Sequence, residues 1–175
     1  YMNQYDLSKL ISELDVIETN INKILTKYLP KLEGDKVIQI GTTFNMFGNS
    51  DIIYKSIISL GTCDDIEGVN VIIAKNEKAL LMAWKDLLQN TDPDILIGFN
   101  IYGFDFKYMY ERCCELGIDE AFRNNLGRKR NRVAPFINKT IASSAMGEVI
   151  TAYYDIEGIL IVDVLYHCRK NMNLD

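Results

Sequence analysis

The sequence predicts an α/β domain with a mixed β-sheet flanked by helices, preceded by an amphipathic helix. Two patterns along the chain lead to this fold class. Residues 1–30 place apolar side chains in alternating steps of three and four, which is the spacing of one helix face. From Val37 onward, short β-rich segments and helical segments alternate, separated by Gly, Asn and Asp. This order is typical of an α/β domain.

The N-terminal helix is defined by one apolar seam and by Pro30, which lies just beyond it. The seam consists of Leu7, Leu10, Leu14, Ile17, Ile21, Ile24 and Tyr28. A seam of this length is at the lower limit for a coiled coil. A helix that packs on its own domain is therefore the favoured interpretation, and a coiled coil is the alternative.

The rest of the chain supplies the strands and helices of the domain. The predicted strands are rich in β-branched residues and span residues 37–44, 52–60, 69–74, 94–99 and 158–162. The predicted helices span residues 77–89, 104–116 and 164–171, with Asn76 as a cap for the first and Gly117 at the end of the second. The stretch between Gly117 and Gly158 is expected to be a loop region rich in Arg and Asn.

Length and composition limit the classes of protein that the chain can belong to. Its 175 residues suit one domain, and 48% hydrophobic and 25% charged residues are ordinary for a globular protein. A net charge of −5 argues against a surface that coats nucleic acid everywhere, but it allows a local basic groove. The cysteines lack the spacing of a zinc site, and no signal peptide or membrane-spanning run is present.

The candidate active site lies where the strand 94–99 gives way to the following helix. Asp105 stands at this junction, and active sites of open α/β sheets lie beyond the carboxyl ends of strands. Asn100 can bond a ligand, and Phe99, Tyr102 and Phe104 offer faces on which bases could stack. Composition alone favours the alternative, in which Asp105 caps the helix and the aromatic residues belong to the core.

The order of these residues changes that balance. Asn100-x-x-x-Phe104-Asp105 resembles the second exonuclease motif of the family B DNA polymerases. Other segments are similar to the same family in order and spacing: Val37-Ile-Gln-Ile-Gly, residues 93–100, the helix 106–117, Leu126-Gly-Arg128 and residues 158–163. The resemblance covers about residues 33–175, and the sequence of residues 32–41 is most similar to polymerase delta-like enzymes of large DNA viruses.

The resemblance implies a ribonuclease H-like exonuclease fold that removes the 3′-terminal nucleotide of DNA. Members of the family hold two divalent metal ions, Mg²⁺ or Mn²⁺, with four carboxylates. Asp105 is then the catalytic carboxylate and metal ligand of the second motif. Phe99, Asn100, Tyr102 and Phe104 would form the pocket for the DNA 3′ end.

The resemblance also implies partners and a place of action for the parent enzyme. The expected partners are a single-stranded 3′ end, a primer–template and a processivity factor, with no membrane. The expected location is intracellular, with the nucleus and a cytoplasmic viral replication site both open.

The remaining carboxylates of the family site are not found at the expected places. No Asp-x-Glu strand precedes Val37, and Asp15-Val-Ile-Glu18 has helical surroundings. We therefore expect the first motif upstream of Tyr1, with residues 1–32 as a helical insertion and residues 33–175 as a partial exonuclease domain. The third motif, Tyr-x-x-x-Asp, is also absent, and Asp163 is expected to be structural.

These gaps predict that the fragment alone is inactive and cannot hold the metal pair. A free-standing 3′–5′ exonuclease is one alternative to the polymerase assignment. A non-catalytic scaffold or single-strand binding module is the other.

A basic cluster occupies the predicted loop region. Its members are Arg123, Arg128, Lys129, Arg130 and Arg132, with no acidic residue between Ala121 and Gly147. Arg128, Lys129 and Arg130 are candidate phosphate contacts beside the site. A solvated surface loop is an equally good interpretation of the same charges.

Overall fold

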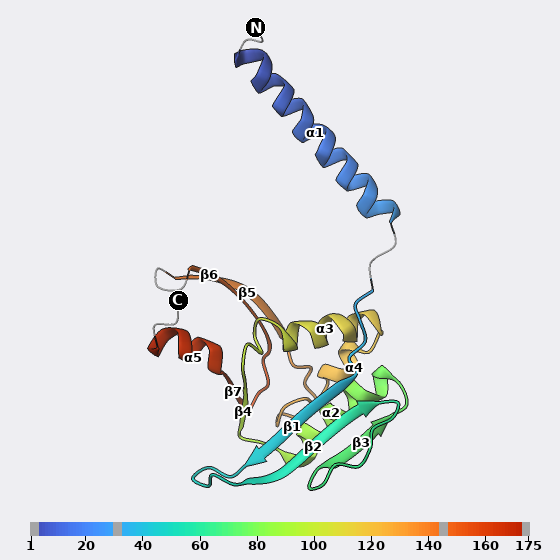
Figure 1. Cartoon of the computed structure of the whole chain (residues 1–175), viewed down its shortest axis with the longest axis vertical. Coiled ribbons are helices and arrows are strands. Elements are labelled where there is room, and N and C mark those ends of the chain that lie inside the picture. The colour runs from blue at the N-terminus through green and yellow to red at the C-terminus, as the bar shows by residue number, and fades with distance from the viewer. Residues whose placement is uncertain (1–3, 30–32, 144–146, 173–175) are drawn as a thin grey trace. The chain divides into compact units, whose positions relative to one another are not determined.

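The computed structural model describes residues 4–29, 33–143 and 147–172, and its helices and strands confirm the α/β class (Figure 1). The chain divides into two compact units, Tyr1–Glu33 and Gly34–Asp175. The first unit contains one described helix, and the second contains the strands and the other helices. Each unit is described separately below.

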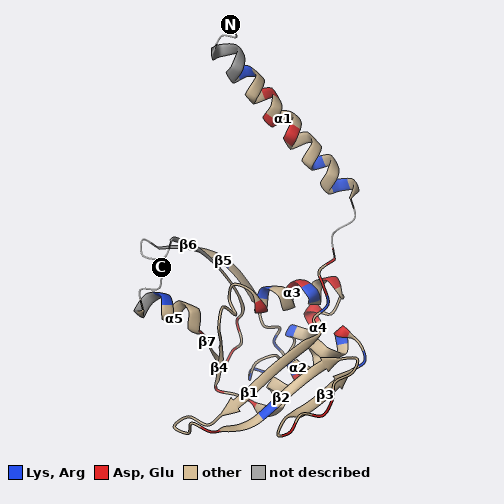
Figure 2. Cartoon of the chain, viewed as in Figure 1, with Lys and Arg blue, Asp and Glu red and all other residues tan. Residues whose placement is uncertain are grey.

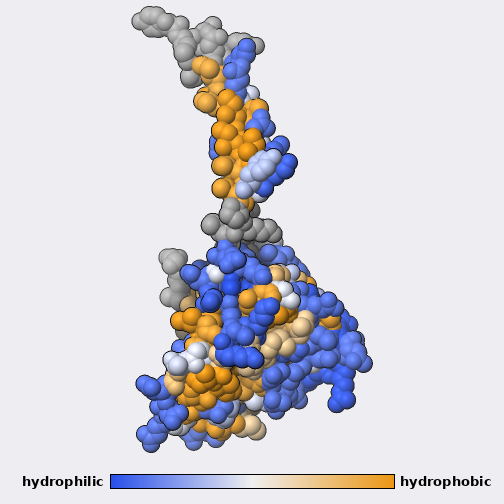
Figure 3. Space-filling model, turned by 90° about the vertical axis from the view of Figure 1, so that its right-hand side faces the viewer, coloured by the Kyte–Doolittle hydropathy of each residue, from blue (hydrophilic) through white to orange (hydrophobic). Residues whose placement is uncertain are grey.

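The first unit is the helix α1 (Gln4–Tyr28), as the apolar spacing predicts. The apolar seam of this helix is exposed within the unit. Its exposed members are Leu10, Leu14, Ile17, Ile21, Ile24 and Tyr28. Figure 3 shows apolar side chains gathered along one side of α1. Packing of the seam on the chain's own domain, or in a coiled coil, stays a prediction.

The second unit begins with a mixed three-stranded sheet. β1 (Gln39–Asn45) pairs with β2 (Ile52–Leu60) in antiparallel fashion, and β2 pairs with β3 (Asn70–Ala74) in parallel. The turn between β1 and β2 contains Gly48, whose φ of 85° suits a residue without a Cβ. The first three predicted strands are thereby confirmed, with shifts of one or two residues at some ends.

The helix α2 (Glu77–Thr91) packs against β2 and β3 and forms much of the core. Its start is fixed as predicted, because the Asn76 side chain accepts a hydrogen bond from the amide of Ala79 at 2.9 Å. Its buried apolar residues are Leu80, Leu81, Trp84, Leu87 and Leu88. Trp84 stacks on Phe122, with ring centroids 6.1 Å apart.

The second half of the unit is organised by a parallel strand pair. β4 (Ile95–Gly98) runs beside β7 (Leu160–Asp163), from Ile95 opposite Leu160 to Gly98 opposite Asp163. α3 (Asp105–Glu115) follows β4, and α5 (Val164–Asn171) follows β7. Within the described residues, backbone hydrogen bonds define three separate sheets, so the strands do not form the one mixed sheet that the sequence predicts.

The prediction of a loop region between Gly117 and Gly158 is wrong. It contains the short helix α4 (Asp119–Arg123) and an antiparallel pair of strands, β5 (Phe136–Ser143) and β6 (Gly147–Tyr154). Both strands are rich in β-branched and aromatic residues, which favour β-structure. The prediction of a loop followed the basic, Asn-rich sequence before them and overlooked this propensity.

The strand pair β5–β6 places one aromatic residue, Tyr154, in the core. Tyr154, at the end of β6, is fully buried among Phe106, Phe122 and Phe136, with ring centroids 5.2 to 5.6 Å away. Burial raises the pKa of Tyr154, and its hydroxyl has no hydrogen-bond partner among the described residues. The aromatic contacts around the ring therefore have to outweigh an unsatisfied polar atom.

A buried ion pair joins α2, α3 and the segment that leads into β1. Arg112, 5% exposed, donates to both carboxylate oxygens of Glu77, 4% exposed, at 2.8 and 2.7 Å. Arg112 also donates to the Gly34 carbonyl at 2.7 Å and to Glu115. The Val37 amide donates to Glu77 at 2.9 Å. α3 carries acidic and basic residues along its length (Figure 2). Its Lys107–Glu111 pair is exposed, whereas the pair of Arg112 with Glu77 is buried.

The charge state of Glu77 follows from these contacts. Burial alone would raise the pKa of Glu77, but hydrogen bonds from Arg112 and Val37 outweigh it, so the pKa lies below the ordinary 4.5. The hydrogen bonds with Glu77 raise the pKa of Arg112 in turn. Both partners are therefore charged at neutral pH, and each satisfies the other.

We predict that Glu77→Gln lowers the free energy of unfolding by about 3 kcal/mol at pH 7, because it leaves the buried Arg112 charge without its buried carboxylate partner and with only the partly exposed Glu115. Urea unfolding followed by the fluorescence of the single Trp measures this change. The matched control is Glu111→Gln, which removes the exposed pair with Lys107 at 3.9 Å and should change stability by less than about 0.5 kcal/mol. Equal effects of the two substitutions would contradict the prediction.

The same pair predicts a pH dependence. Because the folded pKa of Glu77 lies below 4.5, its contribution is complete above that pH and is lost as the pH falls further. The stability difference between the native chain and Glu77→Gln should therefore stay constant from about pH 7 to 5 and shrink below pH 4.5. A difference that grows on acidification would have the wrong sign.

Candidate active site at the end of β4

The candidate site is built on the loop between β4 and α3. The loop, residues 99–104, begins where β4 ends and turns the chain into the helix. Asn100 has a φ of 57°, in the left-handed region that Asn tolerates better than most residues. Its carbonyl accepts hydrogen bonds from the amides of Gly103 at 3.1 Å and Phe104 at 3.0 Å. The loop is thus a tight, hydrogen-bonded turn.

Close approach favours glycine on both sides of this turn, more strictly at Gly98 than at Gly103, where the approaching atom is the movable end of the Asn100 side chain. A Cβ on Gly103 would meet Oδ1 of Asn100 at well under 3.0 Å, and a Cβ on Gly98 would meet the Ile101 side chain as closely. The groups that approach the two glycines are therefore side chains of the loop itself. The close approach at Gly98 and Gly103 therefore serves the packing of the turn.

The Asp163 side chain anchors the loop from the neighbouring strand. Its Oδ1 accepts from the Asn100 amide at 2.8 Å, and its Oδ2 accepts from the Tyr102 amide at 3.0 Å. Oδ1 also accepts from the Leu165 amide at 3.0 Å, which caps α5. The sequence suggests a structural role for Asp163 but not these partners. An Asp at the start of a predicted helix is the signal that points to the cap.

The aromatic residues of the loop differ in their exposure. Phe99 and Phe104 are 65% and 60% exposed, and Phe104 stacks on Tyr108 at 5.6 Å between ring centroids. Tyr102 is half-buried, and its hydroxyl donates to the Ile161 carbonyl at 2.8 Å. Its carbonyl accepts from the Ala152 amide at 2.8 Å. Phe99 and Phe104 thus present open faces, whereas Tyr102 ties the loop to β6 and β7.

Asp105 is the first residue of α3, and its side chain is exposed. The protein atoms around the carboxyl nevertheless raise the pKa of Asp105, and the negative charge of Asp163 raises it further. In the described part of the chain, no side chain caps α3 at Phe104. Asp105 lies in the first turn, where the helix dipole favours a negative charge.

The residues present do not by themselves fit a two-metal site. Across residues 4–29, 33–143 and 147–172, no group of three or more His, Cys, Asp or Glu side chains could hold a metal ion. Asp163 is buried, and its oxygens already accept three backbone amides. Asp15 and Glu18 lie on α1, as the helical spacing predicts. Among the described residues, Asp105 therefore belongs to no cluster of side chains that could hold a metal ion.

The basic cluster is largely paired with carboxylates. Arg128 donates to Asp92 and Asp94, each at 2.7 Å. Lys129 lies 3.4 Å from Glu157, which also pairs with Arg132 at 2.7 Å. Arg123 pairs with Asp119 at 2.6 Å. The contact with Asp94 places Arg128 next to the amino end of β4, whereas Asp105 follows the carboxyl end.

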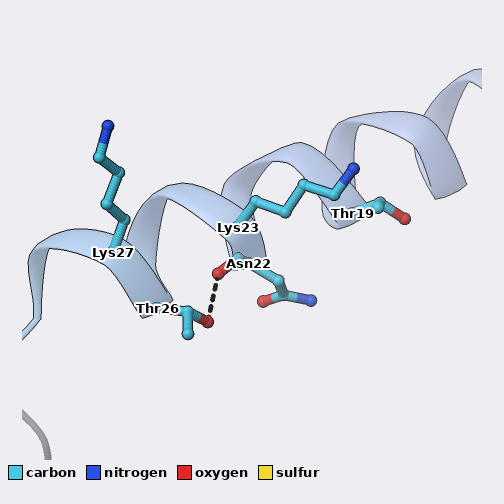
Figure 4. Close-up of a pocket in the computed structure, with 5 residues that line it drawn as sticks. All are labelled: Thr19, Asn22, Lys23, Thr26 and Lys27. Atoms are coloured by element: carbon cyan, nitrogen blue, oxygen red, sulfur yellow. Dashed lines mark hydrogen bonds between the residues drawn. The ribbon is translucent and has the colours of Figure 1, made fainter.

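Arg130 lines an open hollow of about 630 Å³ together with Gln89, Asn125 and Arg128. A second hollow, of about 490 Å³, is the open polar side of α1 around Thr19, Asn22, Lys23, Thr26 and Lys27 (Figure 4). The Thr26 hydroxyl there donates to the Asn22 carbonyl at 2.7 Å. Asp105 lines neither hollow, so the candidate site is the exposed surface of the loop 99–104 together with Asp105 at the start of α3.

An α/β domain that presents a carboxylate and open aromatic faces beyond a parallel strand suits the class of enzymes that act on nucleic acid ends. The sequence model described as "DNA polymerase family B, exonuclease domain" matches residues 8–175, and the chain belongs to this family. The match begins inside α1, earlier than residue 33, where the resemblance in the sequence begins.

Several curated proteins are similar to this chain. The DNA polymerase of Pyramimonas orientalis virus is 41% identical over 91% of the chain. The DNA polymerase delta catalytic subunits of Caenorhabditis elegans and Arabidopsis thaliana are each 33% identical, over 83% and 84% of the chain. The chain spans about 13% of the length of each of these relatives. The family model that it matches describes the exonuclease domain, and each of these relatives is much longer than this chain.

We predict that Gly98→Ala destabilises the domain by about 1–3 kcal/mol, because the new Cβ would overlap the Cγ2 methyl of the partly buried Ile101 side chain. Gly41→Ala is the matched control, since a Cβ on Gly41 meets nothing within 4 Å. Its effect should stay within about 0.5 kcal/mol. Urea unfolding of both variants provides the comparison, and a neutral Gly98→Ala would show that the turn has room for a Cβ that the structure does not give it.

Proposed function

We propose that this chain supplies part of the 3′–5′ proofreading exonuclease site of a family B DNA polymerase, in a ribonuclease H-like fold. The observation that carries the proposal is the exposed Asp105 carboxylate on an anchored loop at the carboxyl end of β4. Asp105 would be one ligand for a divalent cation, Mg²⁺ or Mn²⁺. The other ligands would come from segments beyond the described residues.

The residues around Asp105 suit a pocket for a DNA 3′ end. Phe99 and Phe104 have exposed rings on which a terminal base can stack, an interaction that tolerates any base. Asn100 offers a side-chain amide beside them, and Tyr102 holds the loop that carries all three. The pocket would therefore recognise an unpaired end by its shape and its stacking rather than by its sequence.

The longer polymerase is the setting for this activity. We propose that it binds a primer–template and a processivity factor during DNA replication, in the nucleus or at a viral replication site. Residues 1–32 would be a helical insertion ahead of the partial exonuclease domain, residues 33–175. None of the helices in the described ranges has the length and apolar character needed to span a membrane.

We predict that Asp105→Ala abolishes removal of a mismatched 3′ nucleotide by the full-length polymerase, while nucleotide incorporation continues. Loss of one metal-binding carboxylate should lower excision at least about 100-fold. The assay follows a 5′-labelled primer with Mg²⁺ and, separately, with Mn²⁺. Asp64→Asn, at an exposed acid on the loop after β2, is the control and should leave excision intact.

The isolated chain of 175 residues should not shorten the same primer, because the described residues place no further carboxylates beside Asp105 that could complete a metal site. Shortening that disappears on Asp105→Ala in the isolated chain would refute this expectation. It would also bring Asp15 and Glu18 back as candidate ligands. A free-standing exonuclease would then become the better description.

A single-strand binding module is the second candidate function, favoured by the lone carboxylate together with the exposed aromatic residues. Phosphate contacts from Arg128, Lys129 and Arg130 belong to this proposal, and Arg130 lacks an ion-pair partner among the described residues. If these residues bind phosphate, Arg130→Gln should weaken binding of single-stranded DNA and flatten its salt dependence by about one unit of slope. Fluorescence anisotropy across a salt titration measures both quantities. An unchanged slope would leave the loop as a solvated surface.

A further inference from the structure

We propose that Asp163 is a positioning residue for the exonuclease reaction, which holds the loop 99–104 in the conformation that presents Asp105. The inference rests on the proposed function, since it concerns the same site. It is carried by the hydrogen bonds that one buried carboxylate makes with the backbone of this loop. Asp163 acts through these amides and not on the DNA.

The carboxylate of Asp163 is fully engaged by backbone amides. Its side chain is 4% exposed, and its two oxygens accept from the amides of Asn100, Tyr102 and Leu165 at 2.8 to 3.0 Å. An ionised carboxylate accepts hydrogen bonds only, so it matches three backbone donors without further partners. A neutral amide in its place keeps one acceptor oxygen and turns the other acceptor into a donor.

The loop needs such an anchor because its backbone continues neither the extended conformation of β4 nor the helical conformation of α3. Asn100 has the left-handed φ of 57°, and the chain turns from strand to helix within six residues, 99–104. Tyr102 is fixed at three points: its amide by Asp163, its carbonyl by Ala152 and its hydroxyl by Ile161. The direction in which α3 starts, and with it the place of Asp105, is therefore set from β7.

The same carboxylate fixes the start of α5. Asp163 is the N-cap of that helix and lies opposite Gly98 in the parallel pair β4–β7. The loop that presents Asp105 and the helix that follows β7 therefore share one anchor. Loss of the carboxylate should move both together, whereas an exposed acid nearby should move neither.

The test uses the full-length polymerase with Asp163→Asn and Asp163→Ala. The matched control is Asp155→Asn, which removes the same charge from an exposed position. Excision of a mismatched 3′ nucleotide gives kcat and KM, and nucleotide incorporation serves as the internal reference. Thermal unfolding of each variant is recorded in parallel.

We expect Asp163→Ala to lower kcat for excision about 100-fold, the effect of a misplacement of about 1 Å at a reaction centre. Asp163→Asn should give a smaller loss, because its amide oxygen still accepts from the loop. KM for the DNA end and the rate of incorporation should change little, and Asp155→Asn should match the native enzyme. A loss of kcat graded from Asn to Ala supports the positioning role.

The Asn variant decides the outcome if the Ala variant does not fold. Unchanged excision kcat in a folded Asp163→Asn enzyme overturns the proposal. Unfolding of the Asn variant also overturns it, because the carboxylate then supports the whole domain and not the loop. Asp105→Ala in the same assay separates the two hypotheses: if it leaves excision intact, the proposed function fails, whatever Asp163 does.

Discussion

Arg112 and Glu77 exchange two hydrogen bonds in the interior of the domain, and the position of the candidate site depends on this contact. Arg112 belongs to α3, whose first residue is Asp105, and Glu77 is the first residue of α2. Two buried charges tolerate little displacement, because each loses a charged hydrogen-bond partner when the other moves. The contact therefore fixes α3 against α2 and, through Gly34 and Val37, against the segment that enters β1.

The loop before α3 is held from the opposite direction. Asp163 binds its amides from β7, and Ala152 and Ile161 bind Tyr102 from β6 and β7. The first turn of α3 thus lies between a buried ion pair and a set of backbone hydrogen bonds. A carboxylate with the role proposed for Asp105 needs this rigidity, since small errors of placement reduce catalysis strongly. The exposed rings of Phe99 and Phe104 are carried by the same fixed segment.

Local sequence signals predicted most of the elements of this protein. The apolar spacing gave α1, the β-branched runs gave β1 to β4 and β7, and the Asn76 cap marked the start of α2. These features depend on neighbours a few residues apart, so a single sequence contains them. The motif Asn100-x-x-x-Phe104-Asp105 likewise pointed to the family that the comparisons then showed. β5 and β6 were missed, because strong basic and Asn-rich character before them hid their β propensity.

Contacts between distant residues were decided only by the tertiary structure. Glu77 and Arg112 are 35 residues apart, and Asn100 and Asp163 are 63 residues apart. The pairing of Arg128 with Asp92 and Asp94 has the same character, and it sets the basic loop against the amino end of β4. The sequence by itself determined the family, the helices other than α4 and most strands, and it proposed Asp105 as the site residue. The tertiary structure decided that the Asp105 carboxylate stays exposed and that the Asp163 carboxylate is buried and hydrogen-bonded to backbone amides. The reason is that burial and hydrogen-bond partners depend on how the chain folds back on itself.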